Sequence, residues 1–445
     1  MRRNRNIPHR KNGRANEQGT IITLIAVFML FVVGAMAALS VDVVTIYTAR
    51  SEAQLAADGA ALAAARVLAN SGATSDTTDT LMGLAQPLAS KVAIQVAEQN
   101  QVGGVKLTGT QVSTPVFGVS NGNPTVTVRV QASLPTFFAR IWGSTQITVA
   151  ASATAEAYNP SGVVATVASS APPVAPLCVK PWLLPNMDPS IAGGTIFNAA
   201  TGVITDPSLL GWTSSTPTPA VPMSLACDPP NTGSSGDCSG TLPNPQPWQY
   251  YPGNDDPTSF PHPTNSTPTC SSIPTLTNYQ ASIAGCVQTP LACNSSAVNI
   301  DLSNYPSRDT ETADAVNCLT HATTAGGGDT VVSTAPPSVP FQFVAGTDNP
   351  IPGLPGSSVV VSDSLVTVPV FNSTSGISPT NPVQIVGFVQ LFLNPTGTGV
   401  LDSGPTSGQI STTVINLAGC GTNATGTPII GNGASPVAVR LISPP

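Results

Sequence analysis

Charged and aromatic side chains are both scarce in this chain, at 8% and 5% of its 445 residues. The formal net charge is −7 and the pI is near 4.8, so the chain as a whole repels phosphate, which excludes nucleic acid as a partner. The three histidines, His9, His262 and His321, are scattered along the sequence. This scatter disfavours a histidine-based metal site or catalytic triad.

Two motifs of common enzymes are also missing. The sequence contains neither a Walker phosphate loop nor the H-E-x-x-H zinc motif. It therefore predicts a protein that is not an enzyme, with no catalytic, cofactor-binding or metal-binding residue and no evident small-molecule substrate.

Proline and cysteine are nearly absent from the first third of the chain. Residues 1–158 hold 5 of the 44 prolines and none of the eight cysteines, and residues 159–445 hold the rest. Two regions of different composition thus meet near residue 159. A chain of this length is also expected to form two domains.

Positive charge is concentrated in a basic leader, residues 1–17, which contains six of the 15 basic residues. From Asp42 onward there are 9 basic and 21 acidic residues. Residues 18–41 carry no charge and are nearly all apolar, and as a helix they would extend about 36 Å against a hydrocarbon core of roughly 30 Å. The positive-inside rule then predicts a cytoplasmic leader, a transmembrane helix over 18–41 and an exported remainder.

A cleaved signal peptide is the alternative to a membrane anchor, because Ala35-Met36-Ala37 fits a small-residue cleavage pattern. The apolar character continues past Ala37 through Leu39 and Val41. This continuation favours the uncleaved anchor.

Residues 42–68 lack proline and repeat alanine at helical spacing, so the membrane helix should continue outward until Asn70-Ser71-Gly72 ends it. One face is made of small apolar side chains, and it fits packing on the chain's own downstream domain as well as contact with partner subunits. This alanine face comprises Ile46, Ala49, Ala53, Ala56, Ala57, Ala60 and Ala64.

A second helix is expected over residues 80–100, where leucine and valine recur at spacings of three and four. Strand patterns follow in 105–119, 125–134 and 146–157, with a turn at 120–124. Region 42–158 therefore predicts a pilin-like helix with a small antiparallel sheet, and the fold class is α+β.

Six residues along the first helix form a recognisable pattern. A glycine precedes the apolar run, an acidic residue stands at its exit, an aromatic and a basic residue follow, and a glutamine precedes an alanine-rich run with a central aspartate. These residues are Gly19, Asp42, Tyr47, Arg50, Gln54 and Asp58. The pattern resembles the N-terminal region of Tad (tight adherence, Flp) pilus-assembly proteins of the TadE/TadG-like group, over about residues 17–68 and again over 135–157. Gly59 departs from that group, where alanine is usual.

The resemblance implies a role in building or anchoring a thin surface pilus. It implies a single-pass protein of the bacterial inner (cytoplasmic) membrane, with a cytoplasmic N-terminus and most of the chain in the periplasm or cell envelope. The implied partners are the membrane and other pilus-assembly or pilin-like subunits. Prepilin peptidases cut after a glycine that has glutamate five residues beyond the cut, and neither Gly13 nor Gly19 meets this pattern. We therefore expect an intact N-terminus and an anchor, not a polymerised pilin.

Residues 159–177 are rich in proline and small side chains and predict an extended linker. Residues 178–445 predict a mainly β exported domain that contains every cysteine. These are Cys178, Cys227, Cys238, Cys270, Cys286, Cys293, Cys318 and Cys420. An even number of cysteines on an oxidising side favours disulfides, and zinc at Cys318 with His321 is the weaker alternative.

The last hundred residues contain four strand-like segments, 359–371, 383–393, 410–421 and 436–442. They predict a β-sheet core in which 383–393, apolar on both faces, is a covered central strand.

Two functions fit these observations. The favoured one is a membrane-anchored structural component of Tad/Flp-type pilus assembly that acts through protein–protein contacts. The alternative is an envelope-displayed adhesin or ligand-binding module on a pilin-like anchor. The binding site of such a module would use aromatic residues in loop-like sequence, although aromatic residues are more often buried in the core. Those residues are Trp182, Trp212, Trp248, Tyr250 and Tyr251.

Overall fold

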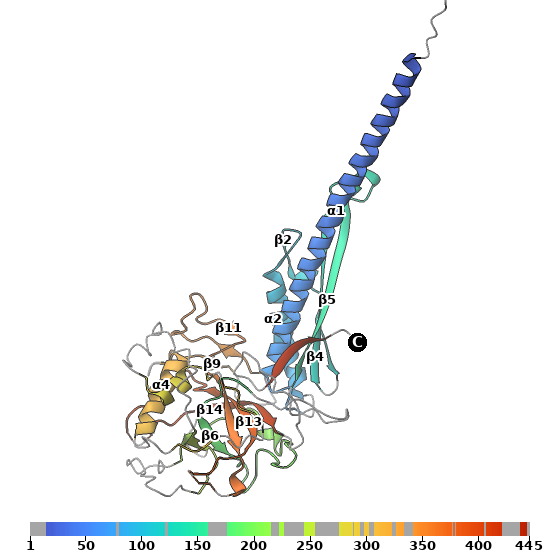
Figure 1. Cartoon of the computed structure of the whole chain (residues 1–445). Helices are drawn as coiled ribbons and strands as arrows, with labels where there is room; N and C mark the ends of the chain where they lie inside the picture. The colour runs from blue at the N-terminus through green and yellow to red at the C-terminus, as the bar shows by residue number, and fades with distance from the viewer. Residues whose placement is uncertain are drawn as a thin grey trace, which may run out of the picture. The chain divides into compact units, whose positions relative to one another are not determined.

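A computed structural model describes most of the chain (Figure 1). The described residues are 15–76, 80–120, 123–158, 176–214, 222–226, 244–253, 276–287, 289–293, 298–301, 307–322, 326–332, 341–375, 377–378, 380–404, 406–420 and 437–442. The few helices and several sheets confirm the α+β class.

Helix α1 (Ala15–Ala69) has 55 residues. In the described part of the chain it is the one helix long and apolar enough to cross a membrane, and none of residues 21–41 is buried. It ends one residue before the predicted stop, where Gly72 has φ 76°, a left-handed conformation that glycine adopts without strain.

Helix α2 (Thr80–Glu98) confirms the second predicted helix. Its most buried residues are alanines four apart, and the predicted leucines and valines flank them. The fully buried alanines are Ala85, Ala89, Ala93 and Ala97. The short strands β1 (Gln101–Val102) and β2 (Val105–Lys106) then form a hairpin, followed by the 3-10 turn η1 (Gly109–Gln111).

A four-stranded sheet has the order β15-β5-β4-β3. Its strands are β3 (Val116–Ser120), β4 (Asn123–Pro135), β5 (Gln146–Tyr158) and β15 (Ala438–Ile442), with the 3-10 turn η2 (Ala139–Trp142) between β4 and β5. The alternation predicted in β4 is present, since Val126, Val128 and Val130 are fully buried.

Strand β15 corrects one expectation. Segment 436–442 was expected to join the other C-terminal strands, but β15 pairs antiparallel with β5, from Ala438 opposite Tyr158 to Ile442 opposite Thr154. Arg440 stabilises the pairing of β15 with β5, because its guanidinium bonds the buried Glu156 carboxylate and lies 4.5 Å above the Tyr158 ring centre. A local strand pattern does not identify its partner strand.

The largest sheet has six strands in the order β14-β13-β12-β6-β8-β7. The strands are β6 (Trp182–Pro185), β7 (Ser224–Leu225), β8 (Gln249–Pro252), β12 (Leu365–Phe371), β13 (Ile385–Leu393) and β14 (Thr412–Gly419). Pairs β12–β6 and β7–β8 are parallel and the other pairs are antiparallel. Every residue of β13 is buried between β12 and β14, which confirms the covered central strand.

Smaller elements complete the description. Helices α3 (Asn278–Ala284) and α4 (Arg308–Thr320) are linked by a hydrogen bond between the Tyr279 and Thr312 hydroxyls at 3.0 Å. A three-stranded sheet has the order β11-β10-β9, and two further 3-10 turns are described. These elements are β9 (Thr330–Val331), β10 (Phe343–Val344), β11 (Ser358–Val359), η3 (Pro207–Leu209) and η6 (Ser373–Ser375).

The chain divides into two compact units. The first comprises Met1–Ala57, Ala97–Ser113 and Arg129–Ser152, and the second comprises Asp58–Val96, Thr114–Val128 and Ala153–Pro445. Almost all of the expected linker 159–177 lies outside the described residues, so the division at that segment stays a prediction.

Candidate functional site

Asp42, the first charged residue after the apolar run, is buried in the first unit. Its carboxylate accepts hydrogen bonds from three consecutive backbone N–H groups, those of Phe137 at 2.8 Å, Phe138 at 3.0 Å and Ala139 at 2.7 Å. Burial works to raise the pKa of Asp42, but these bonds and the nearby Arg140 charge outweigh it and hold the pKa below its ordinary value. The carboxylate therefore fixes the 136–144 loop to α1.

Arg50 and Gln54 lie further along α1, beside a shallow pocket of about 230 Å³ in the same unit. The Gln54 side-chain amide donates to the Ser152 carbonyl at 3.3 Å, which ties α1 to β5, the strand that runs alongside it in Figure 1. Arg50 and Arg129 are both exposed, and neither forms an ion pair among the residues described. Two unpaired guanidinium groups beside one pocket suit a carboxylate or phosphate of a partner.

The remaining members of the predicted motif lie elsewhere on α1. Gly19 belongs to its first turns, Tyr47 is 72% exposed, and Asp58 is half-buried. The structure thus brings Arg50 and Gln54 to one pocket, whereas Asp42 lies away from that pocket lining and binds the 136–144 loop. Sequence reasoning missed Arg129 and the Phe137–Ala139 amides, although residues 135–157 contain these amides and resemble the TadE/TadG-like group.

The alanine face of α1 is covered by the chain itself. All its alanines are fully buried, and Ile46 is half-buried. This finding supports the first of the two readings, packing on the chain's own downstream region. The alanines of this face are therefore not accessible for contact with a partner.

Two disulfides are described, Cys178–Cys286 and Cys293–Cys420, with Cα–Cα distances of 4.2 and 5.3 Å. Cys318 is also disulfide-bonded, so the zinc alternative is wrong, and His321 instead bonds the Asp363 carboxylate at 2.9 Å. No group of three or more potential metal ligands occurs within the described ranges. Three candidate cysteines lie outside those ranges, namely Cys227, Cys238 and Cys270.

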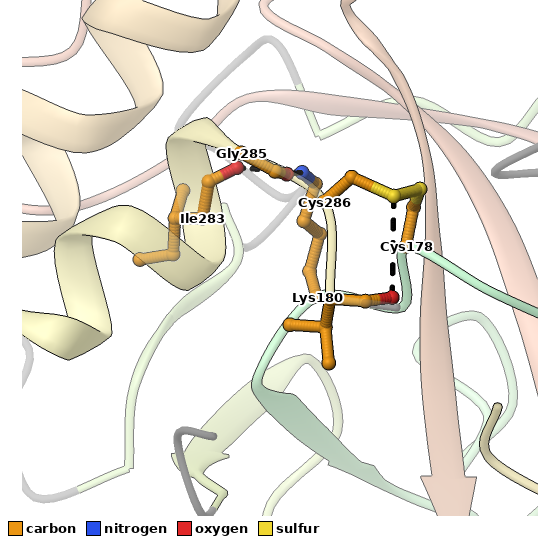
Figure 2. The surroundings of a disulfide bond; sticks show 6 residues. Cys178, Lys180, Ile283, Gly285 and Cys286 are labelled. Atoms are coloured by element: carbon orange, nitrogen blue, oxygen red, sulfur yellow. Dashed lines mark hydrogen bonds between the residues drawn. A yellow bond between two sulfur atoms is a disulfide. The ribbon is translucent and has the colours of Figure 1, made fainter. Parts of the chain in front are cut away.

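Lys180 lies beside the Cys178–Cys286 disulfide (Figure 2). Its ammonium group donates to the carbonyls of Ile283 at 2.5 Å and Gly285 at 2.8 Å, at the C-terminal end of α3. Burial lowers the pKa of Lys180 to about 8, although the Asp363 charge opposes the shift. A helix C-terminus attracts a cation, so this lysine holds α3 against the segment that carries Cys178.

Residues 118–122 read G-x-S-x-G, but Ser120 pairs with Asn123 at the end of a β3–β4 hairpin. A nucleophile elbow needs a strand-to-helix turn, so this motif does not place a catalytic serine.

The aromatic residues of the adhesin alternative belong mostly to the core. Trp182, Tyr250 and Tyr251 are fully buried, Trp248 is 1% exposed, and Trp212 is half-buried. Trp212 and Trp248 pack edge to face with ring centres 5.0 Å apart. These residues therefore form no exposed aromatic surface for a ligand.

Comparison with known proteins identifies one segment. Residues 19–67 match the family model described as "Putative Flp pilus-assembly TadE/G-like", and this match contains all six motif residues of α1. No curated protein and no solved structure matches the chain.

Proposed function

We propose, from the TadE/G-like segment in α1, that this protein is a membrane-anchored structural component of a Tad/Flp-type pilus-assembly system. The observation that carries the proposal is a change of environment along one helix. Apolar side chains from Ile21 to Val41 are not buried by the chain, whereas the alanines of the alanine face, from Ala49 to Ala64, are fully buried. A helix that is apolar all round and uncovered needs lipid, and one with a covered face belongs to a folded domain.

The orientation in the proposal follows from charge and cysteine chemistry. Six basic residues precede the apolar run, and the described disulfides all lie after it. Positive flanks stay in the cytoplasm and disulfides persist in an oxidising compartment. We therefore place the N-terminus in the cytoplasm and the bulk of the chain in the periplasm or cell envelope, with the inner membrane as the anchoring membrane.

Partner contacts are proposed on the uncovered face of α1 just beyond the membrane. Val44, Tyr47 and Leu55 are 63%, 72% and 66% exposed, and at 100° per residue they fall within a narrow sector together with Ser51. Exposed large apolar side chains on an otherwise packed helix are typical of protein–protein contacts. Other pilus-assembly or pilin-like subunits are the proposed partners.

Deletion of the gene and complementation test this function. We expect the deletion strain to lose surface pili and the full chain to restore them. A Tyr47→Ser, Leu55→Ser double variant should accumulate normally and fail to restore pili, whereas Ile351→Ser, at a residue 55% exposed in the second unit, should restore them. Retained pili with lost adhesion in the deletion strain would contradict assembly and favour an adhesin.

Retention of the leader distinguishes an anchor from a polymerised subunit. Six positive charges on the cytoplasmic side resist extraction of the helix from the bilayer, because moving charge across hydrocarbon is costly. Intact-mass analysis of the membrane-extracted protein should show the complete N-terminus. Recovery from sheared pili of a species that starts at Arg14 or Thr20 would favour a minor pilin.

A further inference from the structure

The 136–144 loop exposes apolar side chains at the place where α1 leaves its uncharged run. Phe137, Phe138 and Ile141 are 54%, 36% and 73% exposed, and Arg140 is exposed beside them. All belong to the first unit, as does Asp42. Isolated exposed apolar residues are common in proteins, but three in one short loop with an arginine are not explained by the fold.

Asp42 fixes the height of this loop along α1. Its carboxylate holds the N–H groups of Phe137, Phe138 and Ala139 at 2.7 to 3.0 Å, so the loop backbone lies within one hydrogen bond of the helix at residue 42. The uncharged residues 18–41 extend about 36 Å as a helix, roughly 6 Å more than the hydrocarbon core. Asp42 therefore falls at the level of the lipid headgroups, and the loop falls there with it.

We propose that the 136–144 loop inserts Phe137, Phe138 and Ile141 into the outer interface of the bilayer that α1 spans, with Arg140 among the lipid phosphates. Phenylalanine and large aliphatic side chains of interfacial segments enter the boundary between headgroups and acyl chains, and arginine extends toward headgroups while its stem remains in the apolar layer. The inference rests on the proposed membrane anchoring and adds a second membrane contact. With two contacts fixed to each other through Asp42, the first unit cannot rotate freely about the helix axis.

Continuity of the loop with the membrane anchor favours lipid, and not a protein partner, as the material that covers its apolar side chains. The exposed apolar surface of α1 extends up to Asp42 through Leu39 and Val41, and beyond it to Val43. A surface that lies beside the lipid-covered part of its own helix meets lipid without any additional molecule.

Fluorescence quenching by lipids brominated on their acyl chains tests the proposal on the full chain in phosphatidylcholine–phosphatidylglycerol nanodiscs. Trp142 belongs to the 136–144 loop, so it is first replaced with phenylalanine, and the three remaining tryptophans supply the background. Tryptophan then replaces Phe137, and each variant is compared with this Trp142→Phe parent. Ile141→Trp serves as a second loop variant in case the first is poorly folded. Phe28→Trp, within the apolar run, is the positive control for the anchor.

Val105→Trp is the matched negative control. Val105 is 62% exposed, and its hairpin is held to Glu52 by a bond from the Gly103 N–H at 2.7 Å. Glu52 lies about 15 Å further along α1 than Asp42. The hairpin therefore tests an equally exposed site on the same unit beyond the headgroups.

We expect strong quenching for Phe28→Trp, clear quenching for both loop variants and little for Val105→Trp. Loop variants quenched no more than Val105→Trp, with Phe28→Trp quenched, would overturn the loop insertion and leave the anchor standing. Such a result would assign the loop to water or to a protein partner. An unquenched Phe28→Trp would overturn the anchor and the loop insertion together.

Discussion

Two buried charges in this protein, Asp42 and Lys180, are held by backbone groups. Asp42 accepts from three N–H groups of the 136–144 loop, and Lys180 donates to two carbonyls at the end of α3. A buried charge is costly unless hydrogen bonds replace its water. Each side chain therefore fixes a loop or helix end, and each can be tested at its own position.

Replacing Asp42 with asparagine should loosen the 136–144 loop. The amide loses the negative charge and presents a donor to N–H groups that need an acceptor. We expect hydrogen exchange at residues 137–139 to accelerate by about 10-fold or more. Glu52→Gln is the control, and it should affect the hairpin at Gly103 without affecting the loop. Unchanged exchange at 137–139 in Asp42→Asn would contradict the role assigned to this carboxylate.

The same loop should respond to acid in the wild-type protein. Because the folded-state pKa of Asp42 is lowered, its stabilising contribution is present above its unfolded pKa and disappears as pH falls through the folded value. Protection of residues 137–139 should persist to about pH 4 and decline below it.

Lys180 should make stability depend on pH in the alkaline range. Its folded-state pKa is about 8 and its ordinary value is 10.5, so the unfolded chain binds more protons between these values and stability rises with pH there. The gain from pH 7 to 9.5 is roughly 2 kcal/mol. Lys180→Met should lack this gain, and Lys91→Met, at an exposed residue of α2, should keep it.

Denaturant unfolding in detergent at pH 7 and pH 9.5 measures the free energy of unfolding of each variant relative to that of the wild-type protein. Taking differences cancels the opposing contribution of buried tyrosines, such as Tyr279, whose pKa is raised to about 12 mainly by burial. If the difference in free energy of unfolding between the wild-type protein and Lys180→Met is the same at pH 7 and pH 9.5, the pKa of Lys180 is not lowered.

At the scale of elements, α1 passes through three different surroundings. Its first part is uncovered and apolar, its alanines are buried, and its end is bonded to β14 in the second unit. The Asn416 amide donates to the Ala69 carbonyl at 2.6 Å, and the Ser75 hydroxyl donates to the Leu417 carbonyl at 2.9 Å. The first of these bonds satisfies a carbonyl at the end of α1, which has no partner within the helix.

Two glycines near this end should respond oppositely to alanine. A Cβ at Gly59 would meet only Val96 Cγ1, at an ordinary 3.8 Å, so Gly59→Ala should stabilise the protein by roughly 0.5–1 kcal/mol. Gly72 has φ +76°, and its Cβ would lie 2.9 Å from the Ile415 carbonyl oxygen. Gly72→Ala should therefore destabilise by more than about 1 kcal/mol. Denaturant midpoints check both, and effects of the same sign would contradict this account.

At the scale of the whole chain, distant segments are joined covalently and by strand pairing. The two described disulfides connect residues 108 and 127 positions apart, and β15 returns to β5. Cross-links over such distances restrict the unfolded chain and stabilise by about 2–4 kcal/mol each. Under the proposed orientation they also meet a requirement for an oxidising compartment, in which disulfides persist.

Topology reporters test that requirement. A reporter fused after Arg14 should report the cytoplasm, and one fused after residue 160 should report the envelope, because the basic residues precede the apolar run. Alkaline phosphatase and green fluorescent protein fusions at both positions give complementary readings. A cytoplasmic reading after residue 160 would contradict the proposed orientation.

The sequence by itself determined the features that depend on neighbours in the chain. The extent and end of α1, the helix α2, the alternation in β4 and the covered strand β13 follow from composition and periodicity within a short window. The tertiary structure alone decided the long-range partners. Asp42 meets an amide 95 residues away, β15 joins β5, the alanine face is covered by its own chain, and Lys180 meets the end of α3. Such contacts depend on how the whole chain closes, and a local pattern specifies only that a face will be buried, without specifying what covers it.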